Sequence, residues 1–169
     1  MVMGYEISAQ WKEGHVPVIA AFMREPRIYW AINDHLAMQP ESWNIEEYIK
    51  HPDVQTYVAA HNDMMIGYVQ FVRRTSMCGE MTVAFAPHWR GGIAREMTRY
   101  AMAEMFRTGS LLKIFASVPT DNKPAIFAAR HIGMKQEGRL TKAIVRADGL
   151  RDLLIFGVTR DEFLRSKRQ

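Results

Sequence analysis

The sequence is short of cysteine and of long apolar runs, and each shortage excludes a class of protein. Its one cysteine, Cys78, cannot form an internal disulfide, and its six histidines show no spacing typical of a zinc site. We therefore expect no bound metal and a reducing compartment. Because the N-terminus lacks a basic segment followed by an apolar core, and no run of about 18 residues stays apolar, we expect a cytoplasmic protein without a membrane span.

Charge of neither sign is in strong excess. The 22 Lys and Arg residues and 18 Asp and Glu residues give a formal net charge of +4, and much of the excess lies at 73–74 and 165–168. No recognition helix or stacking motif accompanies these basic residues, so the sequence does not favour a nucleic-acid partner. The 169 residues contain no repeat or linker and have the usual length of one compact domain, so we predict a single domain over residues 1–169.

Apolar spacing predicts a mixture of strands and helices. The period of two over residues 54–85 is typical of antiparallel strands, with a turn at Asn62-Asp63, and Asn44 is suited to cap the helix that follows it. The predicted strands are residues 4–9, 54–61, 65–73, 77–85, 111–118, 134–145 and 152–158, and the predicted helices are 12–24, 26–37, 45–50, 93–107, 121–131 and 160–167.

Residues 81–95, MTVAFAPHWRGGIAR, carry the most chemical information, because a strand pattern leads through a glycine loop into a helix. Glycines at 91 and 92 let backbone N–H groups approach an anion, and the start of the helix adds unpaired donors and a partial positive charge. Arg90 and Arg95 add full charges. The segment thus predicts a phosphate cradle, although an ordinary strand-to-helix turn with surface arginines fits the same residues.

This segment resembles the pyrophosphate-binding motif of the GNAT superfamily of N-acyltransferases. In that motif Arg or Gln is followed after two residues by Gly and, one residue later, by Gly or Ala. Aligned on Gly92 and Ala94, the chain has Trp89 at the Arg or Gln position and Arg90 one place later. The resemblance implies that the pyrophosphate of acetyl-CoA contacts Arg90 and the backbone of Gly91, Gly92, Ile93, Ala94 and Arg95.

Two further segments extend the resemblance over roughly residues 54–160. The stretch Val83, Ala84 and Phe85 is similar to the strand whose backbone pairs with the pantetheine arm at a splayed gap between strands, although alternation alone fits an ordinary core strand equally well. Residues 122–138 are similar to the GNAT helix that ends in glycine, which implies a cofactor contact from Asn122. Asn122 is equally suited to cap that helix, and the two roles are compatible.

The resemblance implies an α/β (α+β) fold with a mixed, mostly antiparallel central sheet of six to seven strands flanked by helices. It implies transfer of an acetyl group from acetyl-CoA, the co-substrate, to an amine on a small molecule or protein. Residues 122–138 and 154–163 are similar to the ribosomal-protein alanine acetyltransferase branch. Two positions depart from the family pattern: Trp89, and Ala129 where many members have a Tyr that can protonate the departing thiolate. They leave open the alternative of an inactive GNAT-fold binding or assembly protein, such as a subunit of a larger particle. A homodimer or larger assembly is compatible with either.

Acyl transfer to an amine requires a group that accepts a proton from the ammonium. Glu80, before the cofactor strand, and His88, in the loop before the glycines, are the candidates, although both residue types are more often solvated at the surface. Ser117 ends a predicted strand, where serine usually satisfies local backbone, so we leave it out of the catalytic set. One aromatic cluster fits either core packing or the border of an acceptor pocket: Tyr29, Trp30, Trp43 and Tyr48.

Overall fold

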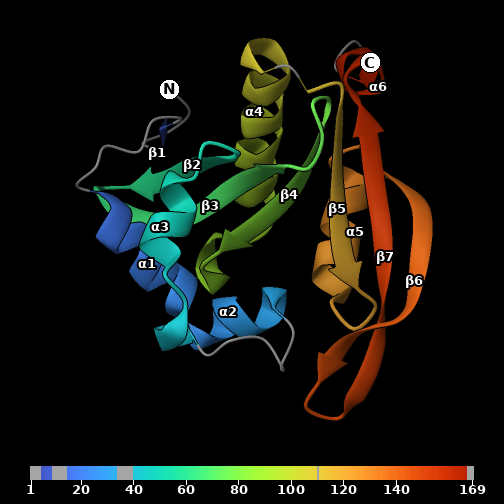
Figure 1. Cartoon of the computed structure of the whole chain (residues 1–169). Helices are drawn as coiled ribbons and strands as arrows, with labels where there is room; N and C mark the ends of the chain where they lie inside the picture. The colour runs from blue at the N-terminus through green and yellow to red at the C-terminus, as the bar shows by residue number, and fades with distance from the viewer. Residues whose placement is uncertain (1–4, 9–14, 34–39, 110, 167–169) are drawn as a thin grey trace.

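A computed structural model describes residues 5–8, 15–33, 40–109 and 111–166, and one seven-stranded sheet runs through them (Figure 1). The strand order is β1-β2-β3-β4-β5-β7-β6, and every neighbouring pair is antiparallel except β4 with β5. The predicted mixed, mostly antiparallel sheet is confirmed. The strands are β1 (Tyr5–Ser8), β2 (Val54–His61), β3 (Met64–Arg73), β4 (Cys78–Phe85), β5 (Lys113–Pro119), β6 (Lys135–Arg146) and β7 (Gly149–Thr159).

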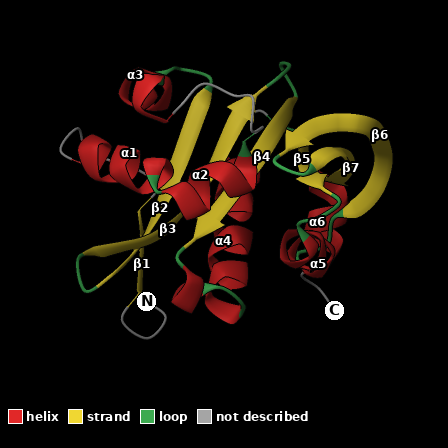
Figure 2. Ribbon diagram, turned by 90° about the horizontal axis from the view of Figure 1, so that it is seen from below, coloured by secondary structure: helices red, strands yellow, loops and turns green. Residues whose placement is uncertain are grey.

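Helices cover both faces of this sheet (Figure 2). Each face of the sheet packs against its own helices, because successive side chains of a strand point to opposite faces. Tyr68 of β3 packs with α1, α2 and α3, whereas its neighbour Val69 packs in the cluster that contains α4, α5 and α6. The helices are α1 (Val16–Arg24), α2 (Pro26–Ile32), α3 (Ile45–Lys50), α4 (Gly92–Thr108), α5 (Lys123–His131) and α6 (Arg160–Ser166), with short 3₁₀ turns η2 (Pro40–Ser42) and η3 (Pro87–Trp89).

Local sequence signals account for several element boundaries. Asn62 and Asp63 both have positive φ, 47° and 62°, as a two-residue type I′ hairpin between β2 and β3 requires. The Asn44 side chain accepts a hydrogen bond from Glu47 N, so its predicted role as the cap of α3 is confirmed. Gly109 stands directly after α4, where its N–H bonds Met105 O.

The observed bounds of the first two helices differ from the predicted ones. α1 begins at Val16, with His15 before it as the N-cap residue, and residues 12–14 of the predicted helix lie outside the described residues. α2 ends at Ile32 because the backbone of Asn33 is extended, with φ −91° and ψ 161°. The predicted helix over 26–37 was therefore wrong at Asn33, and residues 34–37 lie outside the described part of the chain.

Candidate active site

Strands β4 and β5 separate part-way along their length, and this split is the centre of the candidate site. They pair only from Cys78 with Lys113 to Glu80 with Phe115. Beyond that point β4 remains paired with β3 and β5 remains paired with β7, and the two strands diverge in Figure 1. Each therefore has a backbone edge facing the split, and such an edge can pair with an extended ligand. The predicted pantetheine-binding segment 83–85 lies on the β4 edge.

The glycine loop places the start of α4 after the end of β4. Gly91 has φ 96°, which a residue with a side chain rarely adopts, and as N-cap it offers no side-chain hydrogen bond to the helix. A Cβ atom on Gly91 or Gly92 would meet nothing within 4 Å. The first N–H groups of this 17-residue helix therefore begin at an open space, with the positive end of the helix dipole behind them. This geometry fits a phosphate group.

The residues around the glycines divide into charged and packing roles. Arg90 is exposed, and its Nε donates to Phe85 O at 3.1 Å, which ties the loop to the end of β4. Arg95 is exposed on the first turn of α4. Trp89 packs against the apolar core and the ring of His61, with ring centroids 4.9 Å apart. The position that is Arg or Gln in the family motif is thus used here for packing, and Arg90 places a cation one residue later.

Asn122 caps α5, since its Oδ1 accepts a hydrogen bond from Ala125 N at 3.2 Å. The capping interpretation is confirmed, while the predicted cofactor contact stays a prediction. Ala129, at the position of the family's acidic Tyr, is 5% exposed and packs in the core that α5 shares with the sheet. In this chain the position therefore contributes to the core and supplies no acid.

Glu80 is the last residue of β4 that pairs with β5, so its carboxylate lies where the split begins. Ser117 Oγ donates to Oε1 at 2.9 Å from across the split, and Arg74 donates to Oε2 from its Nε and Nη2, at 2.9 and 2.7 Å. The Glu80 side chain is 23% exposed. The carboxylate is thus held on both oxygens and still reaches solvent.

A cavity of about 230 Å³ lies between α1–α3 and the sheet, and Glu80 belongs to its wall. The Tyr48 hydroxyl donates to Gln70 Oε1 at 3.0 Å, and burial raises the pKa of both Tyr29 and Tyr48, so these phenols are neutral near pH 7. The lining of the cavity combines aromatic, aliphatic, polar and charged side chains: Met23, Tyr29, Ile32, Asn33, Trp43, Tyr48, Tyr68, Gln70, Val72, Arg74, Glu80 and Thr82.

The structure brings together some of the residues that the sequence singled out and separates others. Tyr29, Trp43 and Tyr48 pack with one another and also line the cavity, so the packing interpretation is confirmed and the border of an acceptor pocket stays a prediction. His88 is exposed on η3 and is not among the residues that line the cavity. Sequence reasoning did not select Arg74, and it left out Ser117. The hairpin that pairs β3 with β4 places Arg74 beside Glu80, and the pairing of β4 with β5 places Ser117 there.

Comparison with known proteins shows the family of this chain. The family model for the acetyltransferase (GNAT) domain matches residues 9–135. The chain belongs to this family. The SPbeta prophage-derived N-acetyltransferase YokL of Bacillus subtilis is 25% identical over 122 residues, which cover 70% of this chain and 69% of that protein. The sequence-based interpretation of the chain as a GNAT acetyltransferase is thereby confirmed.

Solved structures share the fold of this acetyltransferase. The spermidine N-acetyltransferase of Vibrio cholerae, in complex with CoA and spermine, superposes with a TM-score of 0.77 at 18% identity over 95% of this chain and 98% of that one. The ribosomal-protein-S5-alanine acetyltransferase of Vibrio fischeri has a TM-score of 0.76 at 19% identity, over 96% of this chain and 97% of that one. At such identities the likeness shows a common fold.

The family membership also confirms the predicted activity, which is transfer of an acetyl group from acetyl-CoA to an amine. No finding favours the alternative of an inactive binding or assembly protein. Among the described residues no helix has the length and apolar character needed to cross a bilayer, and none of their His, Cys, Asp and Glu side chains gather in threes suited to a metal ion.

Proposed function

We propose that the acceptor is a small molecule with one primary amine on an aromatic or apolar body, which binds in the cavity between α1–α3 and the sheet. The observation that carries this proposal is that an aromatic cavity has Glu80, the residue at the split, in its wall. The volume of about 230 Å³ lies below the roughly 300–1,000 Å³ typical of ligand pockets, which favours a small acceptor. Faces of Tyr and Trp rings attract both apolar groups and ammonium ions.

The same wall argues against a polyamine as the preferred acceptor. A polyamine carries several positive charges, and binding it in a cavity calls for several carboxylates. Among the described residues that line the cavity, Glu80 is the one acid, and Arg74 already forms an ion pair with it at 2.7 Å. The spermidine acetyltransferases are therefore guides to the fold of this chain more than to its acceptor.

We propose Glu80 as the base that takes a proton from the bound ammonium, directly or through one water molecule. The freed amine nitrogen attacks the thioester carbonyl, the new C–N bond forms, and the C–S bond breaks to release the CoA thiolate, which takes up the second proton that the nitrogen loses. Ser117 and Arg74 hold the carboxylate in place at the split. A thiol with a pKa near about 8.5 leaves without a strong acid, which suits a chain with Ala129 at the usual acid position. His88, outside the cavity wall, receives no role in this scheme.

Acetyl-CoA would bind along the split and at the glycine loop. We assign its pyrophosphate to the backbone of residues 91–95 with Arg90, and its pantetheine arm to the β4 edge at residues 83–85. Asn122, at the start of α5, is the proposed further contact. Support for this assignment comes from the open space before α4 and from the unpaired strand edges at the split.

We also propose that residues 1–169 act as one domain, because one sheet runs from β1 to β6 through the described residues. A cytoplasmic location is part of the proposal, since acetyl-CoA and the free Cys78 both suit a reducing compartment. A homodimer or larger assembly stays a prediction from the resemblance.

The test of the acceptor class is a comparison of three amines by the release of CoA thiol. These are 2-phenylethylamine, spermidine and a short peptide with an N-terminal alanine. We expect kcat/KM for 2-phenylethylamine to exceed that for spermidine by at least roughly tenfold, because the cavity offers rings and one already paired carboxylate. A preference for spermidine would overturn the argument from charge, and a preference for the peptide would point to a protein acceptor.

A further inference from the structure

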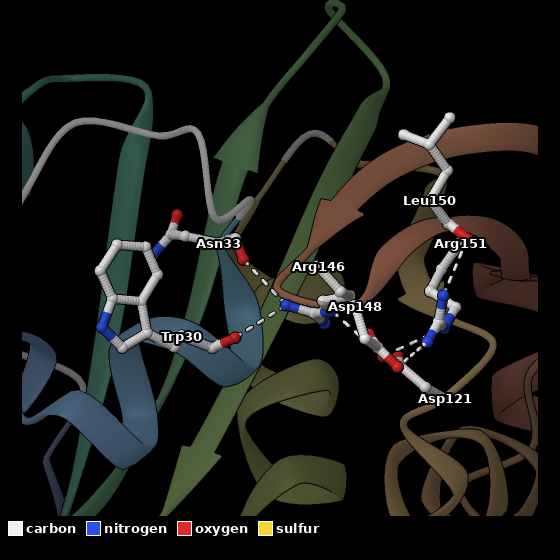
Figure 3. A network of polar contacts seen from close by, with 7 residues as sticks. All are labelled: Trp30, Asn33, Asp121, Arg146, Asp148, Leu150 and Arg151. Carbon is white, nitrogen blue, oxygen red and sulfur yellow. Dashed lines mark hydrogen bonds and ion pairs between the residues drawn. The ribbon is translucent and has the colours of Figure 1, made fainter.

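Arg146 is a buried cation that joins two distant parts of the molecule (Figure 3). It belongs to β6, and its side chain is 8% exposed. Nη1 donates to Trp30 O at 2.8 Å and to Asn33 O at 3.0 Å, and Nε donates to Asp121 Oδ2 at 3.2 Å. Burying a guanidinium costs free energy unless it is paired and hydrogen-bonded, and these contacts supply both.

The two carbonyl groups belong to the end of α2, the helix that supplies part of the acceptor cavity. Trp30 lies in its last turn and Asn33 is its C-cap residue, and the last carbonyl groups of a helix lack partners within it. Tyr29, Ile32 and Asn33 line the cavity, so Arg146 holds the backbone of this wall from outside. Trp30 and Asn33 lie 116 and 113 positions before Arg146 in the sequence.

The carboxylate partner belongs to the cofactor side. Asp121 directly precedes Asn122, the cap of α5 and proposed cofactor contact. A second arginine, Arg151, also approaches Asp121, with Nε 4.0 Å from Oδ2, and it pairs with Asp148. In Figure 3 Arg151 lies on the side of Asp121 away from α2. Arg151 thus shares the Asp121 carboxylate with Arg146, and its hydrogen bonds in the described part of the chain go to Asp148 and Leu150, which makes it a matched control.

We propose that Arg146 is a positioning residue for acetyl transfer, which fixes the acceptor wall on α2 relative to the loop that begins α5. The proposal rests on the acceptor cavity assigned above. Arg146 itself lines no part of that cavity among the described residues and has no chemical step. Arg146 instead sets the positions of Tyr29 and Asn33 when an amine binds beside Glu80. Losing it frees the end of α2 and weakens acceptor binding, while the phosphate cradle at α4 is untouched.

The test compares Arg146→Met, Arg146→Lys and the control Arg151→Met in two measurements on the full chain. The first is amide hydrogen exchange of the peptide that spans α2, which needs no acceptor. We expect faster exchange in Arg146→Met, a smaller change in Arg146→Lys and the wild-type rate in Arg151→Met. The second is steady-state kinetics with 2-phenylethylamine. We expect KM for this amine to rise roughly tenfold in Arg146→Met, because buried charge-assisted hydrogen bonds are lost, with kcat and acetyl-CoA affinity nearly unchanged.

Each outcome has a defined meaning. Equal exchange in all three variants overturns the proposal, as does an equal rise of KM in Arg146→Met and Arg151→Met, or a loss confined to acetyl-CoA affinity. If Arg146→Met does not fold, Arg146→Lys decides, since it keeps the charge but cannot reach both carbonyls and Asp121 together. A wild type that does not acetylate 2-phenylethylamine refutes the proposed acceptor class, and the exchange of α2 still decides the role of Arg146.

Discussion

At the scale of single residues, the position of Glu80 explains its proposed chemistry. A carboxylate on a strand is usually solvated, but this one lies where β4 leaves β5 and accepts hydrogen bonds from Ser117 and Arg74. Both donors fix its orientation, and orientation of a base toward the reacting nitrogen is a large part of its effect. The same contacts leave the carboxylate partly open to solvent and to the cavity.

Replacing the carboxylate by an amide should therefore remove the base and keep the shape. In Glu80→Gln we expect kcat for the preferred amine to fall by about 100-fold or more, because general base catalysis typically contributes that much. Calorimetric affinity for acetyl-CoA should stay the same. The control is Glu104→Gln, which removes another glutamate paired with an arginine, Arg107, away from the cavity wall. Equal activity of Glu80→Gln and wild type would exclude Glu80 as the base.

At the scale of elements, α4 shows how a short loop creates a ligand site. Gly91 takes the positive φ that turns the chain, and Gly92 begins the helix with open space before it. The cradle depends on backbone N–H groups, so the side chains around it are free for other uses. This explains why Trp89 can pack against His61 at the position where the family motif has Arg or Gln.

A negative charge at the start of α4 should abolish the cradle without unfolding the helix. In Gly92→Asp we expect acetyl-CoA affinity, measured by calorimetry, to fall by at least roughly tenfold, because the new carboxylate repels the phosphates at short range. The helix should remain, since acidic residues stabilise helix N-termini. The matched control is Gly92→Asn, which has the same shape without the charge and should retain more affinity. Equal loss of acetyl-CoA affinity in both variants would show that the size of the new side chain, and not its charge, weakens binding.

The start of α6 is held by a carboxylate, so its contribution to stability should depend on pH. Thr159 and Glu162 form a capping box at the start of α6, with Thr159 N and Oγ1 donating to Glu162 Oε2 at 3.0 and 2.8 Å. Lys135 donates to the other oxygen at 2.7 Å, and these bonds lower the pKa of Glu162 from 4.5 to about 2. The ionised carboxylate therefore stabilises the fold above pH 4.5, and this stabilisation is lost as the pH falls toward 2.

We expect the difference in Tm between wild type and Glu162→Gln to be largest at pH 6 and to shrink toward pH 2, in thermal unfolding followed by circular dichroism. The neighbouring Asp161→Asn serves as control, because Lys135 and Thr159 bond Glu162 instead. A difference that is constant over this range would contradict the assigned pKa.

At the scale of the whole molecule, contacts on both faces of the sheet hold the split between β4 and β5 open. On one face a single apolar cluster includes residues of α4, α5 and α6 and continues beneath both strands, from Met81 of β4 to Ala116 of β5. On the other face, polar contacts between described residues join the two sides of the split, among them Ser117 with Glu80 and Arg146 with the carbonyl groups of Trp30 and Asn33. Close packing resists collapse of the gap, so the strand edges remain available to a ligand.

The sequence by itself determined the elements, because periodicity and turn chemistry act over a few residues. Alternation placed β2 within its observed ends, Asn44 marked the start of α3, and the glycines marked the start of α4. The glycine loop predicted a phosphate cradle, and the family resemblance added the split and assigned the cradle to the pyrophosphate of acetyl-CoA. Helix 26–37 was overextended, since apolar spacing does not register the extended backbone of Asn33.

Only the tertiary structure decided which of these residues meet. The contact of Ser117 with Glu80 depends on the register of β4 against β5, and that of Arg146 with α2 joins residues 116 positions apart. His88 and Glu80 were both candidates in the sequence, and only the fold placed Glu80 in the cavity wall and His88 outside it. Local patterns specify which face of an element is buried, whereas the partners on that face follow from how distant elements pack.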